Sequence, residues 1–196
     1  GLAVYALYRS RVRKLERNRA MLQQLVYSRT QHLEKLNAIV KSINEQLDFD
    51  ALLQTILQES SFIQGSDAAW ALVRDCGSAD TLSLRAAWER NGAVPLEHAM
   101  TVDEAATRYV AYADSIAADI YVTGAGRTRA HPASALLAVR IRIEGRIEGF
   151  LVFEKRQPPM AFEQSDLDLI KALKEPFVSA FQKANALRLI EQARTS

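Results

Sequence analysis

Apolar residues recur at helical spacing along the first part of the chain, from about Tyr8 to Leu47, a stretch that contains no Gly and no Pro. They fall seven residues apart, with a second set offset by three, which is typical of a parallel two-stranded coiled coil. At 1.5 Å per residue such a helix would be about 60 Å long, and one of its faces must be buried elsewhere. The predicted homodimer interface consists of Leu15, Leu22, Leu25, Arg29, His32, Leu36, Ile39 and Ile43. Its two polar members either fix the register or extend to solvent.

The coiled-coil pattern breaks at Asp48, which we expect to cap a second helix. That helix runs to about Gln64 and is ended by Gly65, the residue type that most readily adopts the left-handed conformation at a helix end. Apolar residues then alternate with period two over 68–73 and 81–88. This change of period predicts two strands.

The middle of the chain has weaker signals. Thr101 and Glu104 have the spacing of a capping box, which predicts a short helix to about Tyr112. Residues 113–133 contain two Gly and one Pro and are expected to be irregular, with 119–122 as one candidate strand.

The clearest alternation occurs at 137–143 and 147–153 and predicts an antiparallel hairpin. A second capping box, formed by Ser165 and Asp168, predicts a last helix that extends nearly to the end of the chain. Pro176 lies inside this helix and should kink it.

The predicted order is helix, helix, two strands, helix and loop, two strands, and helix. Three segments in this order, 36–57, 134–155 and 162–187, resemble the GAF family. The resemblance implies an α+β fold with an antiparallel, GAF/PAS-like sheet covered by helices, and the long last helix favours GAF over PAS. It divides the chain into residues 1–47, the end of a transmembrane helix and a signalling coiled-coil helix, and residues 48–192, a GAF-like domain.

The function implied by this resemblance is that of a non-catalytic sensory or dimerisation module in a bacterial signal-transduction protein. Such a module relays a signal through a parallel helical dimer, made by the N-terminal helix and the C-terminal helix, to a C-terminal output domain. The Asn-Lys-Phe-Asp-Glu set of cyclic-nucleotide-binding members has no counterpart here. Cys76 also lacks the nearby His of bilin-binding members. We therefore expect no cofactor.

The sequence begins with the apolar stretch Gly1–Tyr8, which is followed by a basic run from Arg9 to Arg19. An apolar, Tyr-containing segment before Arg and Lys is typical of the cytoplasmic end of a transmembrane helix. We therefore predict a membrane-anchored parent protein, with this portion on the cytoplasmic side of the inner membrane. The alternative is an amphipathic helix start with a solvated basic face. A net charge of +2 and the apolar end argue against a nucleic-acid-binding arm.

No Gly-rich phosphate loop, nucleophile motif or metal-loop spacing occurs in the sequence, so we expect neither an enzyme nor a metal site. The alternative function is a small-molecule receptor whose ligand lies under residues 113–133. Aromatic side chains would line that pocket and basic side chains would bind an anionic group, although core packing and solvation explain the same residues more simply. The candidate ligand-binding residues are Trp70, Trp88, Tyr112, Tyr121, Arg127 and His131.

Overall fold

The computed structural model describes residues 2–45, 48–75, 78, 80–90, 99–127 and 134–195. The chain divides into two units, residues 1–38 and residues 39–196. We describe each unit by itself.

The first unit is formed by the helix α1 (Leu2–Glu45), whose last residues belong to the second unit. The absence of Gly and Pro allows the backbone ladder to continue without a break, as predicted. Most side chains of this unit are described from Glu16 onward, and the large apolar ones among them are exposed, except that Leu36 is half-buried. Leu22 is 61% exposed and Leu25 is 53% exposed. Among the described residues, no helix is both long and apolar enough to cross a membrane.

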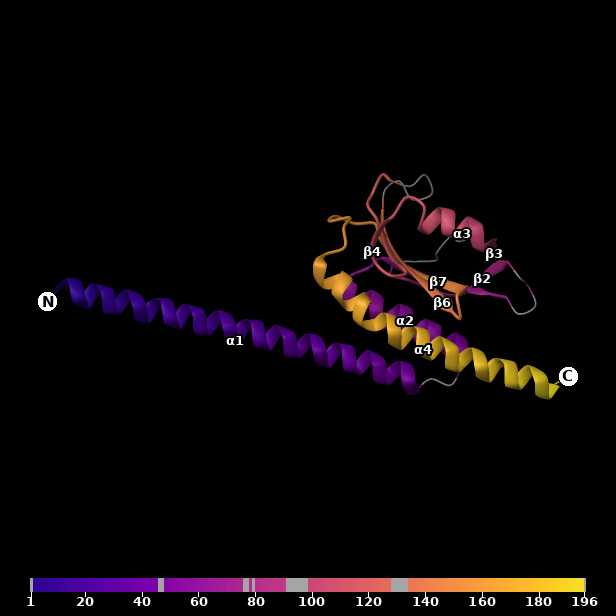
Figure 1. Cartoon of the computed structure of the whole chain (residues 1–196), viewed down its shortest axis with the longest axis horizontal. Coiled ribbons are helices and arrows are strands. Elements are labelled where there is room, and N and C mark those ends of the chain that lie inside the picture. Colours follow the sequence, from indigo (N-terminus) through magenta and orange to yellow (C-terminus); the bar gives the residue numbers. More distant parts are fainter. Residues whose placement is uncertain are drawn as a thin grey trace. The chain divides into compact units, whose positions relative to one another are not determined.

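The second unit is an antiparallel sheet flanked by helices, which confirms the predicted α+β class (Figure 1). The strands lie in the order β3-β2-β1-β7-β6-β5-β4, and neighbouring strands are antiparallel. Its elements are α2 (Phe49–Gln64), β1 (Ala68–Arg74), β2 (Thr81–Glu89), β3 (Ala99–Thr101), α3 (Val102–Tyr109), β4 (Asp114–Ala117), β5 (Ile120–Thr123), β6 (Ala135–Ile143), β7 (Arg146–Lys155) and α4 (Gln164–Thr195).

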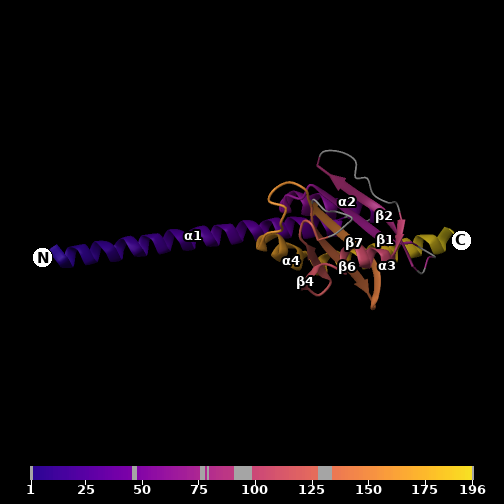
Figure 2. The ribbon, with the colours of Figure 1, turned by 90° about the horizontal axis from the view of Figure 1, so that it is seen from above.

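Helices cover both faces of the sheet. The helices α2 and α4 pack against each other and against one face, where α2 contacts β1 and β2 and α4 contacts β6 (Figure 2). The rings of Phe49 and Phe181 meet edge to face there, with centroids 4.9 Å apart. The short helix α3 lies on the opposite face (Figure 1). The central strands β1 and β7 are therefore buried on both faces, which explains their nearly continuous apolar sequence.

Three of the predicted helix ends are confirmed. The side chain of Asp48 accepts a hydrogen bond from the backbone N–H of Ala51 at 2.9 Å, and Gly65 ends α2 with a φ of 64°. Thr101 and Glu104 form the predicted capping box at the start of α3.

The predicted capping box at Ser165 and Asp168 is wrong, because α4 begins at Gln164 and its capping position is therefore Glu163, two residues before Ser165. The carboxylate of Asp166 instead accepts the backbone N–H of Glu163 at 2.9 Å. Asp166 therefore supplies the acidic half of a capping box from the third helical position, while Ser165 lies inside the first turn.

The segment predicted to be irregular is more regular than expected. Residues 114–123 form the hairpin β4–β5, and β3 pairs with the start of β2. Strands of three and four residues are too short to give a clear alternation of polar and apolar positions, so the sequence pattern indicated one of them at most.

Candidate functional site

Three aromatic side chains occupy the space between α3 and the sheet. Trp70 of β1 and Tyr109 of α3 are 1% exposed, and Phe150 of β7 is fully buried. The indole Nε1 of Trp70 donates a hydrogen bond to the Tyr109 hydroxyl at 3.2 Å. The Tyr109 ring lies 6.3 Å from the Trp70 ring and 5.9 Å from the Phe150 ring, centroid to centroid. The residues that would line a ligand site here pack against one another.

The capping box fixes the start of α3 and so positions Tyr109 at the other end of the helix. The Thr101 hydroxyl accepts the N–H of Glu104 at 3.2 Å, and the Glu104 carboxylate accepts the N–H of Thr101 at 2.7 Å. The backbone hydrogen bond from Thr101, followed by that from its side chain, lowers the pKa of Glu104. The N–H of Val102 also bonds the carbonyl of Asp80 at 2.9 Å, which ties α3 to the start of β2.

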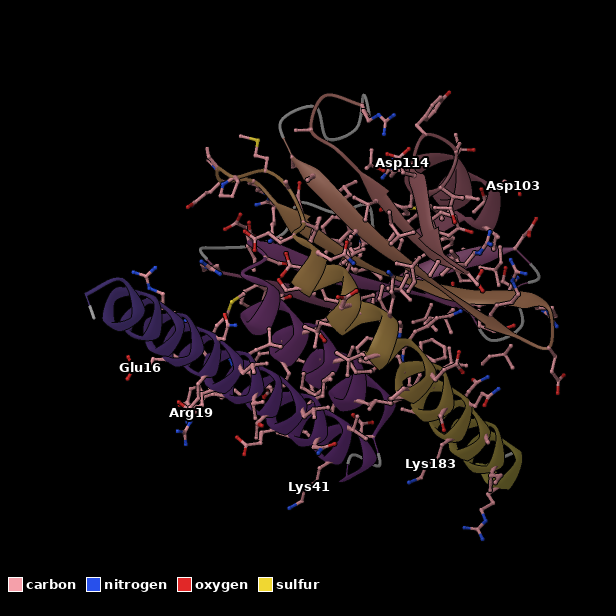
Figure 3. All side chains as sticks on the ribbon, turned by 60° about the vertical axis from the view of Figure 1, so that its left-hand side comes forward. Glu16, Arg19, Lys41, Asp103, Asp114 and Lys183 are labelled. Atoms are coloured by element: carbon pink, nitrogen blue, oxygen red, sulfur yellow. The ribbon has the colours of Figure 1, made fainter. Side chains whose placement is uncertain are left out.

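The structure brings together two of the predicted ligand-binding residues, Trp70 and Tyr121, which both contact the cluster under α3. Trp88 is half-buried on β2 and is not part of that cluster. Tyr112 lies after α3 with 67% of its surface exposed. Arg127 forms an ion pair with Asp114. Figure 3 labels Asp114, which begins β4. His131 lies outside the described residues.

The predicted ligand-binding set omitted two of the three aromatic residues that pack together under α3, namely Tyr109 and Phe150. Tyr109 ends the short helix that the capping box at Thr101 predicted. Its spacing from Thr101 could therefore have placed it on the buried face of that helix. Phe150 alternates within the predicted hairpin, and the pattern alone does not tell which face of the sheet it occupies.

A polar cavity of about 500 Å³ lies where α2 ends and α4 begins. The Asp67 carboxylate accepts the backbone N–H groups of Arg156 and Gln157 at 2.8 and 3.2 Å. Lys155 and Asp166 form an ion pair at 2.7 Å. The cavity is lined by Gly65, Asp67, Arg90, Lys155, Gln157, Pro158, Pro159, Glu163, Ser165 and Asp166. These bonds hold the segment between β7 and α4 against the start of β1.

Beside this cavity, Arg156 binds two acidic side chains, those of Glu89 and Glu154. Burial acts to lower the pKa of Arg156, but the hydrogen bonds and charges of the two glutamates outweigh it and hold the pKa above its ordinary value. Within the described part of the chain, no group of three or more His, Cys, Asp or Glu side chains is arranged to hold a metal ion. The charged side chains of Lys155, Asp166 and Arg156 around the cavity form ion pairs within the domain.

The predicted dimer residues of α1 differ in exposure. Leu22 and Leu25 are exposed, whereas Leu36 is half-buried. Ile39 departs from the prediction, because it is 2% exposed and belongs to the core of the second unit. The apolar repeat continues past the point where α1 joins this core, so the same spacing serves packing within the chain. The remaining side chains of the predicted interface lie outside those described, namely Leu15, Arg29, His32 and Ile43.

Known structures share this fold. The GAF domain of an Acinetobacter phosphoenolpyruvate-protein phosphotransferase matches with a TM-score of 0.61 and 17% identity, over 80% of this chain and 96% of that one. Free methionine-R-sulfoxide reductase from Neisseria meningitidis gives 0.60 and 15%, over 79% and 90%. The chromophore-binding domain of a Stigmatella aurantiaca bacteriophytochrome gives 0.59 and 12%, over 76% and 59%.

No curated protein sequence matches the chain. The family model of the GAF domain matches residues 48–175, which begin at the cap of α2, include the whole sheet and end within α4. The match covers more than half of the chain and agrees with the observed fold. The chain therefore belongs to the GAF domain family, whose fold serves sensing and signalling.

Proposed function

We propose that this chain is a non-catalytic sensory and dimerisation module of a membrane-anchored bacterial signal-transduction protein. It relays a signal through a parallel pair of α1 helices to an output domain that follows α4. The observation that carries the proposal is the exposed apolar stripe of α1. We call this the α1 stripe, made of the exposed Leu22, Leu25, Val26 and Leu33 together with the half-buried Leu36.

The spacing of the α1 stripe suits a second copy of the same helix. Leu22 and Leu36 are two heptads apart, and Val26 and Leu33 are one heptad apart. Val26 is 62% exposed and Leu33 is 58% exposed. Helices derive most of their stability from packing of an apolar face, and a heptad stripe packs best against another heptad stripe. A parallel homodimer supplies that partner with matching register.

The rest of the module supports a path from input to output. The chain starts with an apolar stretch followed by a basic run, as at the cytoplasmic end of a membrane helix. The other end is formed by α4, in which Ile190 is 54% exposed, so this helix also has an apolar residue available to a second copy or to a following domain. We place the module on the cytoplasmic side of the inner membrane, between the anchor and the output.

The relay is favoured over the alternative, a receptor for a small molecule under residues 113–133. Trp70, Tyr109 and Phe150 are buried and contact one another, so their surfaces are covered by protein. The exposed Tyr112 and the paired Arg127 do not converge on this cluster. A receptor would need these aromatic side chains to move apart first.

Sedimentation equilibrium of Leu25→Glu tests the dimer. Each copy would lose the burial of one Leu, about 1.5–3 kcal/mol, and two carboxylates would face each other, so the dissociation constant should rise roughly a hundredfold or more. Gln24→Glu is the matched control, because it adds the same charge one residue away, outside the stripe. A wild-type chain that sediments as a monomer at tens of micromolar, or equal effects of both substitutions, would refute the dimer.

A further inference from the structure

Asp119 occupies the tight turn between β4 and β5. Its φ is 63°, in the left-handed region that Asp and Asn tolerate better than other side chains. Its carbonyl accepts the backbone N–H of Arg140 on β6 at 2.8 Å. Both the backbone and the side chain of this residue are therefore turned toward the rest of the domain.

Three basic side chains surround the Asp119 carboxylate. Arg140 Nε lies 2.7 Å from one oxygen and Arg142 lies 3.2 Å from the same oxygen. Lys174 of α4 lies 3.6 Å from the other oxygen and donates a hydrogen bond to the carbonyl of Ala118 at 2.8 Å. The side chains of Asp119, Arg140 and Lys174 are 15%, 17% and 17% exposed, so water and salt screen these contacts less than those of a surface pair.

These contacts join the hairpin to two different elements. The hairpin β4–β5 is attached to the sheet through four residue pairs between β5 and β6, and β4 lies at the edge of the sheet. Lys174 reaches from α4 to the turn of this hairpin with both of its polar contacts. The side chain thus connects the edge of the sheet to the helix that leaves the domain.

The Lys174 contact lies beside a proline that interrupts the backbone hydrogen bonds of α4. Pro176 is two residues beyond Lys174 and has no N–H, so it cannot bond the carbonyl of Ala172. The loss of one rung makes this turn the place where the helix bends most easily. The hairpin is therefore attached to α4, through Lys174, next to the turn in which the helix lacks one backbone hydrogen bond.

We infer that the contact of Lys174 with Asp119 and Ala118 is a latch that couples the β4–β5 hairpin to α4. While it is closed, the hairpin holds the first third of α4. A partner or ligand that moves the hairpin opens the latch and alters the part of α4 beyond Pro176. This inference rests on the proposed relay, because it supplies the step from the domain to its output helix.

Hydrogen–deuterium exchange of the full chain tests the latch. We would measure Asp119→Asn, Lys174→Met and the double variant, and compare peptides covering 114–123 and 177–190 with those of β1 and β7. Asn keeps the shape of the side chain and tolerates the positive φ. Arg85→Met is the matched control, because it removes a helix-to-strand ion pair with Asp50 of α2, away from the hairpin.

Each single variant should speed exchange of both peptides by roughly five- to tenfold. The double variant should speed exchange of 177–190 little more than Lys174→Met alone, because Lys174 is the side chain that joins the hairpin turn to α4. Arg85→Met should leave both peptides unchanged. Faster exchange of 114–123 alone, or additive effects of the two changes on 177–190, would overturn the latch. If Lys174→Met also speeds exchange of the β1 and β7 peptides, that variant has lost stability as a whole. The exchange result for Asp119→Asn then decides whether the latch exists.

The latch and the relay fail separately. If the exchange result holds but Leu25→Glu and the wild type both sediment as monomers, the latch is confirmed and the dimeric relay is refuted. If the chain dimerises but α4 beyond Pro176 does not respond to either single variant, the dimer is confirmed and the latch is refuted.

Discussion

At the scale of single residues, Gly149 shows how closely β7 approaches β1. A Cβ atom at this position would lie 2.4 Å from the carbonyl oxygen of Leu72 and 3.5 Å from Phe181 of α4. The obstructing oxygen belongs to the backbone of a central strand, and a side-chain rotation cannot relieve the clash. Any residue larger than glycine must therefore separate the two strands under α4.

We expect Gly149→Ala to lower the free energy of unfolding by about 1–3 kcal/mol, the usual cost of overpacking a core. Gly124→Ala is the control, because its Cβ would meet nothing closer than Arg127 Cδ at 3.9 Å and its effect should stay within about 0.5 kcal/mol. Urea unfolding followed by fluorescence measures both changes. Equal stability of the two variants would show that β1 moves aside at no cost.

At the scale of elements, the start of α3 depends on a charged hydrogen bond. The pKa of Glu104 is lowered by the backbone N–H of Thr101 and then by its hydroxyl, while Arg108 adds a smaller effect of the same sign. A carboxylate with a lowered pKa stabilises the folded state above the ordinary glutamate value of 4.5. That contribution is lost as the pH falls through the lower value of the folded protein.

Glu104→Gln should therefore be less stable than the wild type at pH 7, and the difference should shrink as the pH falls below 4.5 and Glu104 becomes protonated in the folded protein. Other carboxyl groups titrate in both proteins, so the difference between the two unfolding curves isolates Glu104. Thermal unfolding at several pH values measures it. A difference that stays constant over this range would mean that the charge of Glu104 contributes nothing.

Elements whose ends depend on neighbouring residues could be predicted from the sequence, whereas contacts between distant residues could not. The caps of α2 and α3 and the β6–β7 hairpin are determined by residues within a few positions of one another, and these predictions are confirmed. The contact between Asp119 and Lys174 joins positions more than fifty residues apart, and no local pattern marks it. Ile39 shows a further limit, because one apolar spacing suits a second copy and the chain's own core equally well.

At the scale of the whole molecule, different helices cover the two faces of the sheet. The face under α2 and α4 carries the helices that lead into and out of the domain. On the other face, Tyr109 of α3 fills the space above Trp70 and Phe150. The chain thus places its own aromatic group over Trp70, one of the predicted ligand-binding residues.

Tyr109→Ala should empty that space and lower the free energy of unfolding by about 3–5 kcal/mol. Because the removed group is a phenol, p-cresol should bind the cavity and restore about 2.7 kcal/mol when present at one hundred times its dissociation constant. Tyr109→Phe keeps the ring and loses the hydrogen bond from Trp70, so it should cost about 1 kcal/mol and gain nothing from p-cresol. Thermal shift with and without p-cresol measures all three proteins. Since the wild-type space is already occupied, stabilisation of the wild type by p-cresol would favour the receptor alternative, because it would show that Tyr109 yields its place to a ligand.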